Sequence, residues 1–168
     1  MAWTTSWSHV GQIIGAQPIN DVDTVQRHPL GTITQGKHPD YGQGEFIYLK
    51  GVSSGALHAW VTYNVDDFTT TLLAANAIGP VGVMMSAMDA AAKYGWGQIS
   101  CKTIGSCKTQ FADNGEVFGT STGGSVDDAS VAGDRVSLAK GASATTANTF
   151  IADFEIHRPF VDDRTVES

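Results

Sequence analysis

The two cysteines are the first residues in this sequence that could carry chemistry. Cys101 and Cys107 are separated by five residues, in the stretch "YGWGQISCKTIGSCKT". A structural zinc site needs about four ligands, usually arranged in C-x2-C pairs. A redox pair takes the C-x-x-C spacing beside the start of a helix. The spacing here fits neither pattern, so the sequence predicts no metal or redox role for these thiols.

Whether the cysteines could form a disulfide depends on the local backbone. A turn at Thr103–Gly105 would place Cys101 opposite Cys107, with Cα atoms about 4.5–5.5 Å apart, which a disulfide can bridge. A single strand running through both would leave them about 20 Å apart, as the rise per residue dictates. We expect free thiols that pack as small apolar side chains.

The five histidines are the next candidates for a metal site or for acid–base catalysis. No two of them stand at i, i+4, so the zinc-protease pattern is absent. His28 and His38 each precede a proline and lie ten residues apart, so they could meet and share a metal. Without further ligands we expect them to be loop residues in solvent. The sequence predicts no metal site.

Carboxylates occur in pairs in a short motif that recurs, Val-Asp-Asp, at Val65–Asp67, Val126–Asp128 and Val161–Asp163. Asp side chains bond to the backbone two residues on and so start turns. Calcium would need an alternating acidic loop, which is absent. We therefore interpret the three pairs as turns rather than as ligands.

Motifs for nucleophilic catalysis and phosphate binding are also absent. The sequence has no G-x-S-x-G, no phosphate loop and no G-x-G-x-x-G. Distant residues could still assemble a catalytic group, but no motif favours it. We expect no catalytic residues, no cofactor and no enzyme activity.

Composition narrows the class of partner. The net charge is −7, and the ten Lys and Arg residues form no run, so nucleic-acid binding is not expected. No apolar stretch reaches membrane-spanning length, and the N-terminus lacks the features of a signal peptide. We expect synthesis in a reducing cytoplasm. Charged residues make up only 16% of the chain, below the usual quarter or so, which favours a surface partly covered by partners.

The secondary structure that would hold the residues discussed above is predicted to consist of β-strands. From Gly44 onward, short apolar runs such as "GEFIYLKG" and "LHAWVTYN" alternate with turn signals such as Asp113–Gly115. Only "SAMDAAAKYG" resembles a helix. The sequence predicts an all-β fold, a small β-barrel or sandwich-like domain at residues 44–168 with at most one short helix. Residues 1–43, with their His-Pro pairs and no sustained period, predict an extended N-terminal arm.

Trp3 and Trp7 lie near the start of this arm, followed by Ile13 and Ile14. Tryptophan is enriched at interface anchors, so these four residues are the candidate partner-binding residues. The alternative is that the tryptophans fasten the arm to the chain's own domain. Trp60 and Trp96 fall within expected strands and indicate core or subunit-interface positions.

Several long stretches resemble a known family. They are "LGTITQGKHPDYGQGEFIYLKGV", "LLAANAIGPVGVMMSAMDAAAKYGWGQISCKTIG", "FADNGEVFGTSTGGSVDDASVAGDRVSLAKGASA" and the closing "FVDD". Together they span Leu30 to Asp163 and are similar to the small head-decoration (capsid cement) proteins of tailed bacteriophages. Residues Met1 to Pro29 match less clearly. The shared stretches are structural rather than catalytic.

The resemblance implies a β-barrel-like domain that binds the outer surface of an assembled capsid and stabilises it. The implied partners are the major capsid protein and other copies of the chain, as a dimer or trimer, with no cofactor. The implied location is the outer capsid surface of the virion. Two alternatives stay open: another virion component of the tail or head-completion type, and a carbohydrate-binding β domain for host attachment, with Trp60 or Trp96 as the platform.

Overall fold

The computed structural model describes residues 6–10 and 15–164, and within this part the chain is all-β, with no helix. Eleven strands form one antiparallel sheet. They are β1 (Ser8–His9), β2 (Ile33–His38), β3 (Gly42–Lys50), β4 (Trp60–Tyr63), β5 (Thr70–Leu72), β6 (Gly79–Met84), β7 (Tyr94–Ser106), β8 (Glu116–Gly119), β9 (Val126–Asp127), β10 (Arg135–Gly141) and β11 (Ile151–Val161). The predicted all-β fold class is confirmed.

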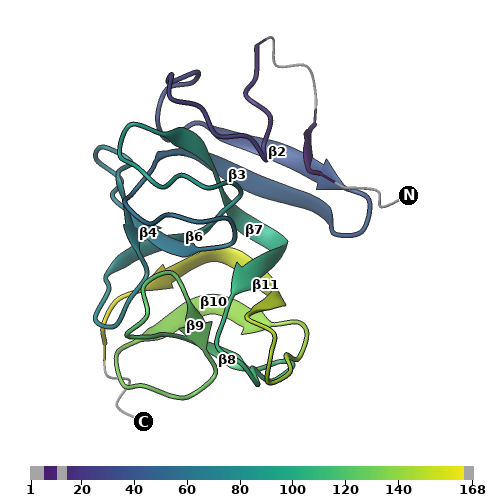
Figure 1. The fold of residues 1–168 in the computed structure, drawn as a ribbon, viewed down its shortest axis with the longest axis vertical. Helices are drawn as coiled ribbons and strands as arrows, with labels where there is room; N and C mark the ends of the chain where they lie inside the picture. The colour runs from purple at the N-terminus through teal and green to yellow at the C-terminus, as the bar shows by residue number, and fades with distance from the viewer. Residues whose placement is uncertain (1–5, 11–14, 165–168) are drawn as a thin grey trace.

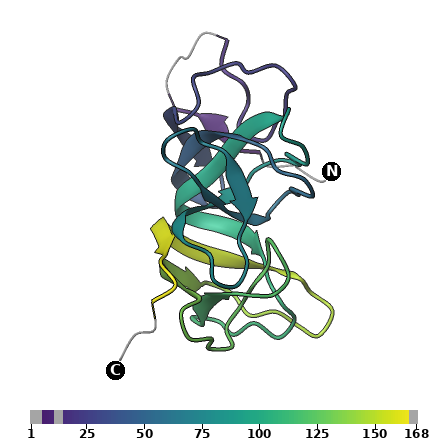
Figure 2. The same ribbon diagram turned by 90° about the vertical axis from the view of Figure 1, so that its left-hand side faces the viewer.

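The sheet runs in the order β1-β2-β3-β7-β6-β11-β10-β8-β9, with the β4–β5 hairpin attached through β6. Figure 1 shows β2 and β3 in the upper half of the elongated molecule and β8 to β10 in its lower half. The view in Figure 2 shows the same two halves stacked along the long axis. A bridge between Cys107 and Val126 brings β9 beside the end of β7, but the sheet is not closed.

Strand β7 joins the two halves because it changes partners along its length. Its first part, from Tyr94 to Ser100, pairs with β3, and its second part, from Ser100 to Ser106, pairs with β11. The change falls beside Cys101, whose φ of 74° lies in the left-handed region. A residue in that conformation bends a strand as a bulge does, so β7 can serve both halves.

The buried apolar residues form four clusters, and the two largest lie in different halves. The lower cluster draws on β4, β6 and β8 to β11 with their loops, and it contains the buried Trp60, Phe154 and Phe111. The upper cluster contains Phe46, Tyr48 and Trp96 from β3 and β7, together with Trp7 and Ile19 from the N-terminal segment, and all five side chains are buried. The core is therefore divided along the long axis rather than concentrated in one layer.

The short helix that the sequence favours over residues 86–95 does not form. This stretch makes turns, and the carbonyl of Met88 accepts a hydrogen bond from the Val52 N–H at 3.0 Å instead of from a helical neighbour. The Met88 carbonyl also lies against Gly55, where a Cβ atom would be only 2.3 Å from the Met88 oxygen. Tertiary hydrogen bonding thus replaces the local helical ladder.

The N-terminal arm contributes strands to the same sheet. The expected boundary between residues 43 and 44 falls inside β3, which pairs with β2 as a hairpin from Ile33↔Ile47 to His38↔Gly42. β1 adds to the outer edge of β2 through Ser8 and His9. Residues 15–31 lie over the end of the upper half in irregular loops (Figure 1).

Candidate functional site

Of the four candidate partner-binding residues, only Trp7 lies in the described part of the chain; Trp3, Ile13 and Ile14 lie outside it. Trp7 is 7% exposed. Its ring packs edge-on against Phe46 at 4.9 Å between centroids, and its backbone N–H donates to Asn20 Oδ1 at 2.8 Å. In this structure Trp7 fastens the N-terminal segment to its own sheet, as the alternative interpretation of the tryptophans expects.

The other two tryptophans are core residues. Trp60 and Trp96 are fully buried, one in the lower cluster and one in the upper cluster. Neither indole presents a face to solvent on which a sugar ring could stack. A carbohydrate platform on either residue would therefore require the core to open.

Both cysteines are free thiols, as predicted. Cys101 lies within β7 and Cys107 directly follows it, so the single-strand alternative describes their geometry. Burial raises the pKa of Cys107 to about 11, and the nearby Asp127 and Asp128 add to the shift. A thiol with so high a pKa is a poor nucleophile at neutral pH, because the thiolate is the reactive form.

Metal ligands do not gather in the described part of the chain, where no group of three or more His, Cys, Asp or Glu side chains could hold an ion. His28 and His38 contact different neighbours: His28 packs on Tyr48 and Trp96, and His38 packs on Trp7 and Tyr41. The two histidines therefore have separate structural environments.

Two of the three Val-Asp-Asp pairs make the backbone contacts that turn chemistry predicts, whereas Val126 and Asp127 form strand β9. Asp67 Oδ1 accepts from the Thr69 N–H at 3.1 Å, and Asp162 Oδ1 accepts from the Arg164 N–H at 3.2 Å. In the third pair Asp128 Oδ2 accepts from the Ala112 N–H at 2.8 Å, which ties two loops together. All three pairs thus organise backbone.

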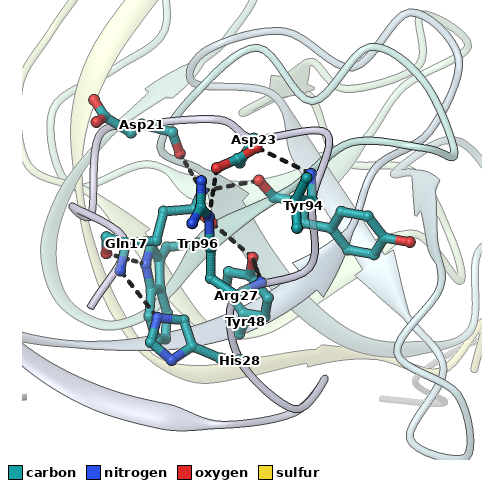
Figure 3. A network of polar contacts seen from close by, with 9 residues as sticks. Gln17, Asp21, Asp23, Arg27, His28, Tyr48, Tyr94 and Trp96 are labelled. Carbon is teal, nitrogen blue, oxygen red and sulfur yellow. Dashed lines mark hydrogen bonds and ion pairs between the residues drawn. The ribbon is translucent and has the colours of Figure 1, made fainter. Parts of the chain in front are cut away.

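A buried polar network holds residues 15–31 on the upper half (Figure 3). Its centre is Gln17, which is 5% exposed. The Gln17 side-chain nitrogen donates to the carbonyls of Asp21 and Tyr94, both at 2.9 Å, and its side-chain oxygen accepts from the Tyr48 hydroxyl at 2.6 Å. Each polar atom of this buried amide is therefore paired, as burial of a polar group requires.

The backbone carbonyl and N–H of Gln17 also have hydrogen-bond partners. Its carbonyl accepts from the Trp96 indole N–H at 2.9 Å and contacts His9 Nε2 at 2.8 Å, and its N–H donates to His28 Nε2 at 3.0 Å. Sequence reasoning missed this residue. The one local signal is a polar side chain placed before Pro18 in a segment with apolar neighbours.

Charged groups complete the network at its outer side. Arg27 pairs with Asp23 at 2.7 Å, and the Asp23 backbone exchanges hydrogen bonds with Tyr94 at 3.0 and 2.8 Å. The pKa of Asp23 lies below its usual value, chiefly because its carboxylate accepts from the Val25 N–H and from Arg27. These groups add short contacts, but the ion pair is exposed and contributes little to stability.

An apolar groove, called here the outer groove, opens on the surface between the β4–β5 hairpin and the strand ends of β6 and β11. Its volume is about 500 Å³, and its lining includes Val65, Ile78, Pro80 and Phe160. The exposed fractions of Ile78, Val65 and Phe160 are 67%, 62% and 42%. Thr62, Thr69 and Thr71 add hydroxyl groups to the lining. Exposed apolar side chains that gather at a hollow indicate an interaction surface.

Comparisons with known proteins identify no relative: neither the protein-family models, nor the curated proteins, nor the solved structures contain a match to this chain. The described residues include no helix with the length and hydropathy to cross a lipid bilayer. The function must therefore be argued from the residues and surfaces themselves.

Proposed function

We propose that the protein is a decoration protein, a structural virion component that binds the outer surface of an assembled phage capsid and stabilises it. The observation that carries the proposal is the resemblance that runs from Leu30 to Asp163. In the fold, these residues include ten of the strands, β2 to β11, and the outer groove. The span of the resemblance thus includes the scaffold and the outer groove, and the part of the β4–β5 hairpin that lines one side of the groove falls between the resembling stretches.

The proposed mechanism is mass action on an assembled partner. A site made by several neighbouring copies of the major capsid protein exists only on the shell, so binding to it stabilises the assembled state. Many copies on one shell multiply weak contacts. The protein would act without chemistry or a cofactor, at the outer capsid surface, as a dimer or trimer.

Two surfaces are available for the contact. The outer groove offers exposed apolar side chains, with Asp66 and Asp67 exposed in the β4–β5 turn beside it. The second candidate rests on the sequence alone, because the remaining candidate anchors Trp3, Ile13 and Ile14 lie outside the described residues. The buried Trp7 would then act by fixing the position from which that segment departs.

The test is co-sedimentation of the purified protein with expanded capsid shells that lack it. The full chain is compared with a variant carrying Trp3→Ala, Ile13→Ser and Ile14→Ser, which keeps Trp7, β1 and the β2–β3 hairpin. Removing residues 1–43 would be a poorer test, because it strips β2 from β3. A variant with Leu57→Ser, at an exposed apolar residue that does not line the outer groove, is the matched control.

Binding by the full chain and the control, with loss in the triple variant, would support decoration through the N-terminal segment. Equal binding by all three would support decoration and move the contact to the outer groove. Absence of binding by the full chain would contradict the proposal. Copy number per particle would then decide for another virion role, and glycan screening would test host attachment.

A further inference from the structure

His28 and His9 both contact Gln17, but they meet opposite kinds of backbone group. The Gln17 N–H, which can only donate, points to His28 Nε2 at 3.0 Å. The Gln17 carbonyl, which can only accept, faces His9 Nε2 at 2.8 Å. Neutral imidazole has one donor and one acceptor nitrogen. His28 must therefore carry its proton on Nδ1, and His9 must carry its proton on Nε2.

Because the two tautomers differ, adding a second proton affects the hydrogen bonds of the two rings differently. The Nδ1 atom of His9 lies 3.1 Å from the Thr34 hydroxyl, and a hydroxyl can either donate or accept. A doubly protonated His9 thus keeps both contacts. A doubly protonated His28 instead places an N–H against the Gln17 N–H, so two donors face each other and the hydrogen bond is lost.

We propose that His28 is a proton-sensitive latch for the loop around Gln17: neutral His28 holds the loop on the upper half of the sheet, and protonated His28 releases it. The inference goes beyond the proposed function and does not depend on it. Release would uncover the edge-packed rings of Tyr48 and Trp96, which lie 5.0 and 5.3 Å from the His28 ring between centroids.

The surroundings of His28 favour its neutral form. Burial lowers its pKa below the ordinary value of 6.5, and the nearby His9 lowers it further. The other ionisable groups of the network are the Asp23–Arg27 pair and Asp21 on the same segment, Tyr48 on β3 and Tyr94 on β7. Imidazole is the ordinary side chain that changes charge between pH 5 and 8, so His28 is a group that can respond there.

The sign of the pH effect follows from this direction. The closed loop binds fewer protons at His28 than the open loop does, because the pKa is lower when His28 is closed in. The closed state is therefore fully favoured above the open-state pKa, near 6.5, and loses that advantage as the pH falls toward the lower pKa of the closed state. In that window the open fraction rises by up to about tenfold per pH unit.

The experiment is hydrogen exchange followed by NMR on the full-length protein between pH 7.5 and 4.5, expressed as protection factors. The reporters are the Gln17 amide and the Trp96 indole N–H, which donates to the Gln17 carbonyl. The amides of Ala152 to Ile156, in the ladder between β7 and β11, report on global unfolding. His28→Gln supplies an acceptor oxygen that does not titrate, and His157→Gln, at an exposed histidine on β11 outside the network, is the matched control.

We expect protection at Gln17 and Trp96 to fall by up to about tenfold per pH unit in the unaltered protein and in His157→Gln, while the β11 amides stay protected. His28→Gln should show no such fall. Flat protection in the unaltered protein, or the same fall in His28→Gln, would overturn the latch.

A second measurement decides the matter if His28→Gln does not fold. The nitrogen shifts of the histidine rings in the unaltered protein report both tautomer and titration. We expect the Nδ1–H tautomer at His28 with a midpoint below 6.5, and the Nε2–H tautomer at His9. The Nε2–H tautomer at His28, or a midpoint at or above 6.5, would contradict the proposal.

Discussion

The two halves of the sheet are stabilised by different kinds of contact. In the lower half, Trp60 and Phe111 pack edge-on against Phe154, at 5.0 and 5.1 Å between centroids. In the upper half, aromatic residues are also buried, but the covering segment is fixed through the hydrogen bonds of Gln17. Apolar packing depends on volume and tolerates changes in pH, whereas a hydrogen-bonded amide depends on each single partner.

This difference predicts which part of the structure opens first. When one hydrogen-bond partner is lost, the other stays buried and unpaired. This costs more free energy than the net contribution of the hydrogen bond. The lower half has no comparable dependence on a single titrating group among its cluster residues. Local opening should therefore begin in the N-terminal covering segment, and the lower half should set the free energy of global unfolding.

The largest effect is expected in the lower half, from Phe154→Ala. Phe154 is fully buried between two aromatic rings, so truncation leaves a cavity and should lower the free energy of unfolding by about 3–5 kcal/mol. Urea denaturation measures it. Phe150→Ala, at a side chain that is 63% exposed, is the control and should change it by no more than about 0.5 kcal/mol. Equal effects of the two substitutions would contradict the prediction that the lower half sets the free energy of global unfolding.

A smaller and local effect is expected in the upper half, from Gln17→Ala. The substitution removes the acceptor of the Tyr48 O–H, whose oxygen still accepts from the Arg27 N–H, and removes the side-chain donor to the Asp21 carbonyl, at a cost of about 1–3 kcal/mol. Hydrogen exchange at Asp23 and Tyr94, whose backbones bond to each other, should quicken while the β11 amides stay protected.

The control for this prediction is Gln26→Ala, because the Gln26 side chain makes one exposed hydrogen bond, to the His28 carbonyl. It should leave exchange at Asp23 and Tyr94 nearly unchanged. Equal acceleration in β11 for Gln17→Ala would mean that the two halves open together, and the comparison between them would fail.

A third effect concerns binding. Ile78→Asp places a charge in the outer groove at a side chain that is largely exposed. If the groove contacts the capsid, affinity for shells should fall by roughly tenfold, which corresponds to about 1.4 kcal/mol. Thermal unfolding should stay nearly unchanged. Leu57→Asp, at another exposed apolar residue, is the control; a similar loss in both variants would show that added negative charge alone weakens binding.

The sequence was sufficient for the parts of the fold that have local signals. Glycine-flanked apolar runs predicted β3 and β7, and the turn at Asp113–Gly115 is present. The free thiols were also expected, although the spacing of the cysteines left a disulfide open until the course of β7 was known. In each case the residues that decide the structure lie within a few positions of one another.

The rest depends on contacts between distant residues. Gln17 meets Tyr48 and Tyr94, which are 31 and 77 positions away, so nothing near Gln17 marks it as the centre of a network. The helical pattern after Ser86 was overridden by the bond from Val52 to Met88. The outer groove likewise arises where the end of β11 meets the start of β6 and the β4–β5 hairpin.

The smallest effect is expected from the ion pair that joins the halves. Arg158 on β11 reaches Glu45 on β3 with two contacts of 3.3 Å, and this partner raises the pKa of Arg158. The Arg158 side chain is mostly exposed, so solvent screens the pair. A double-mutant cycle with Arg158→Met and Glu45→Gln should give a coupling energy of no more than about 1 kcal/mol. High salt should reduce it further. A larger, salt-insensitive coupling would mean that charge, rather than the continuous strand β7, holds the two halves together.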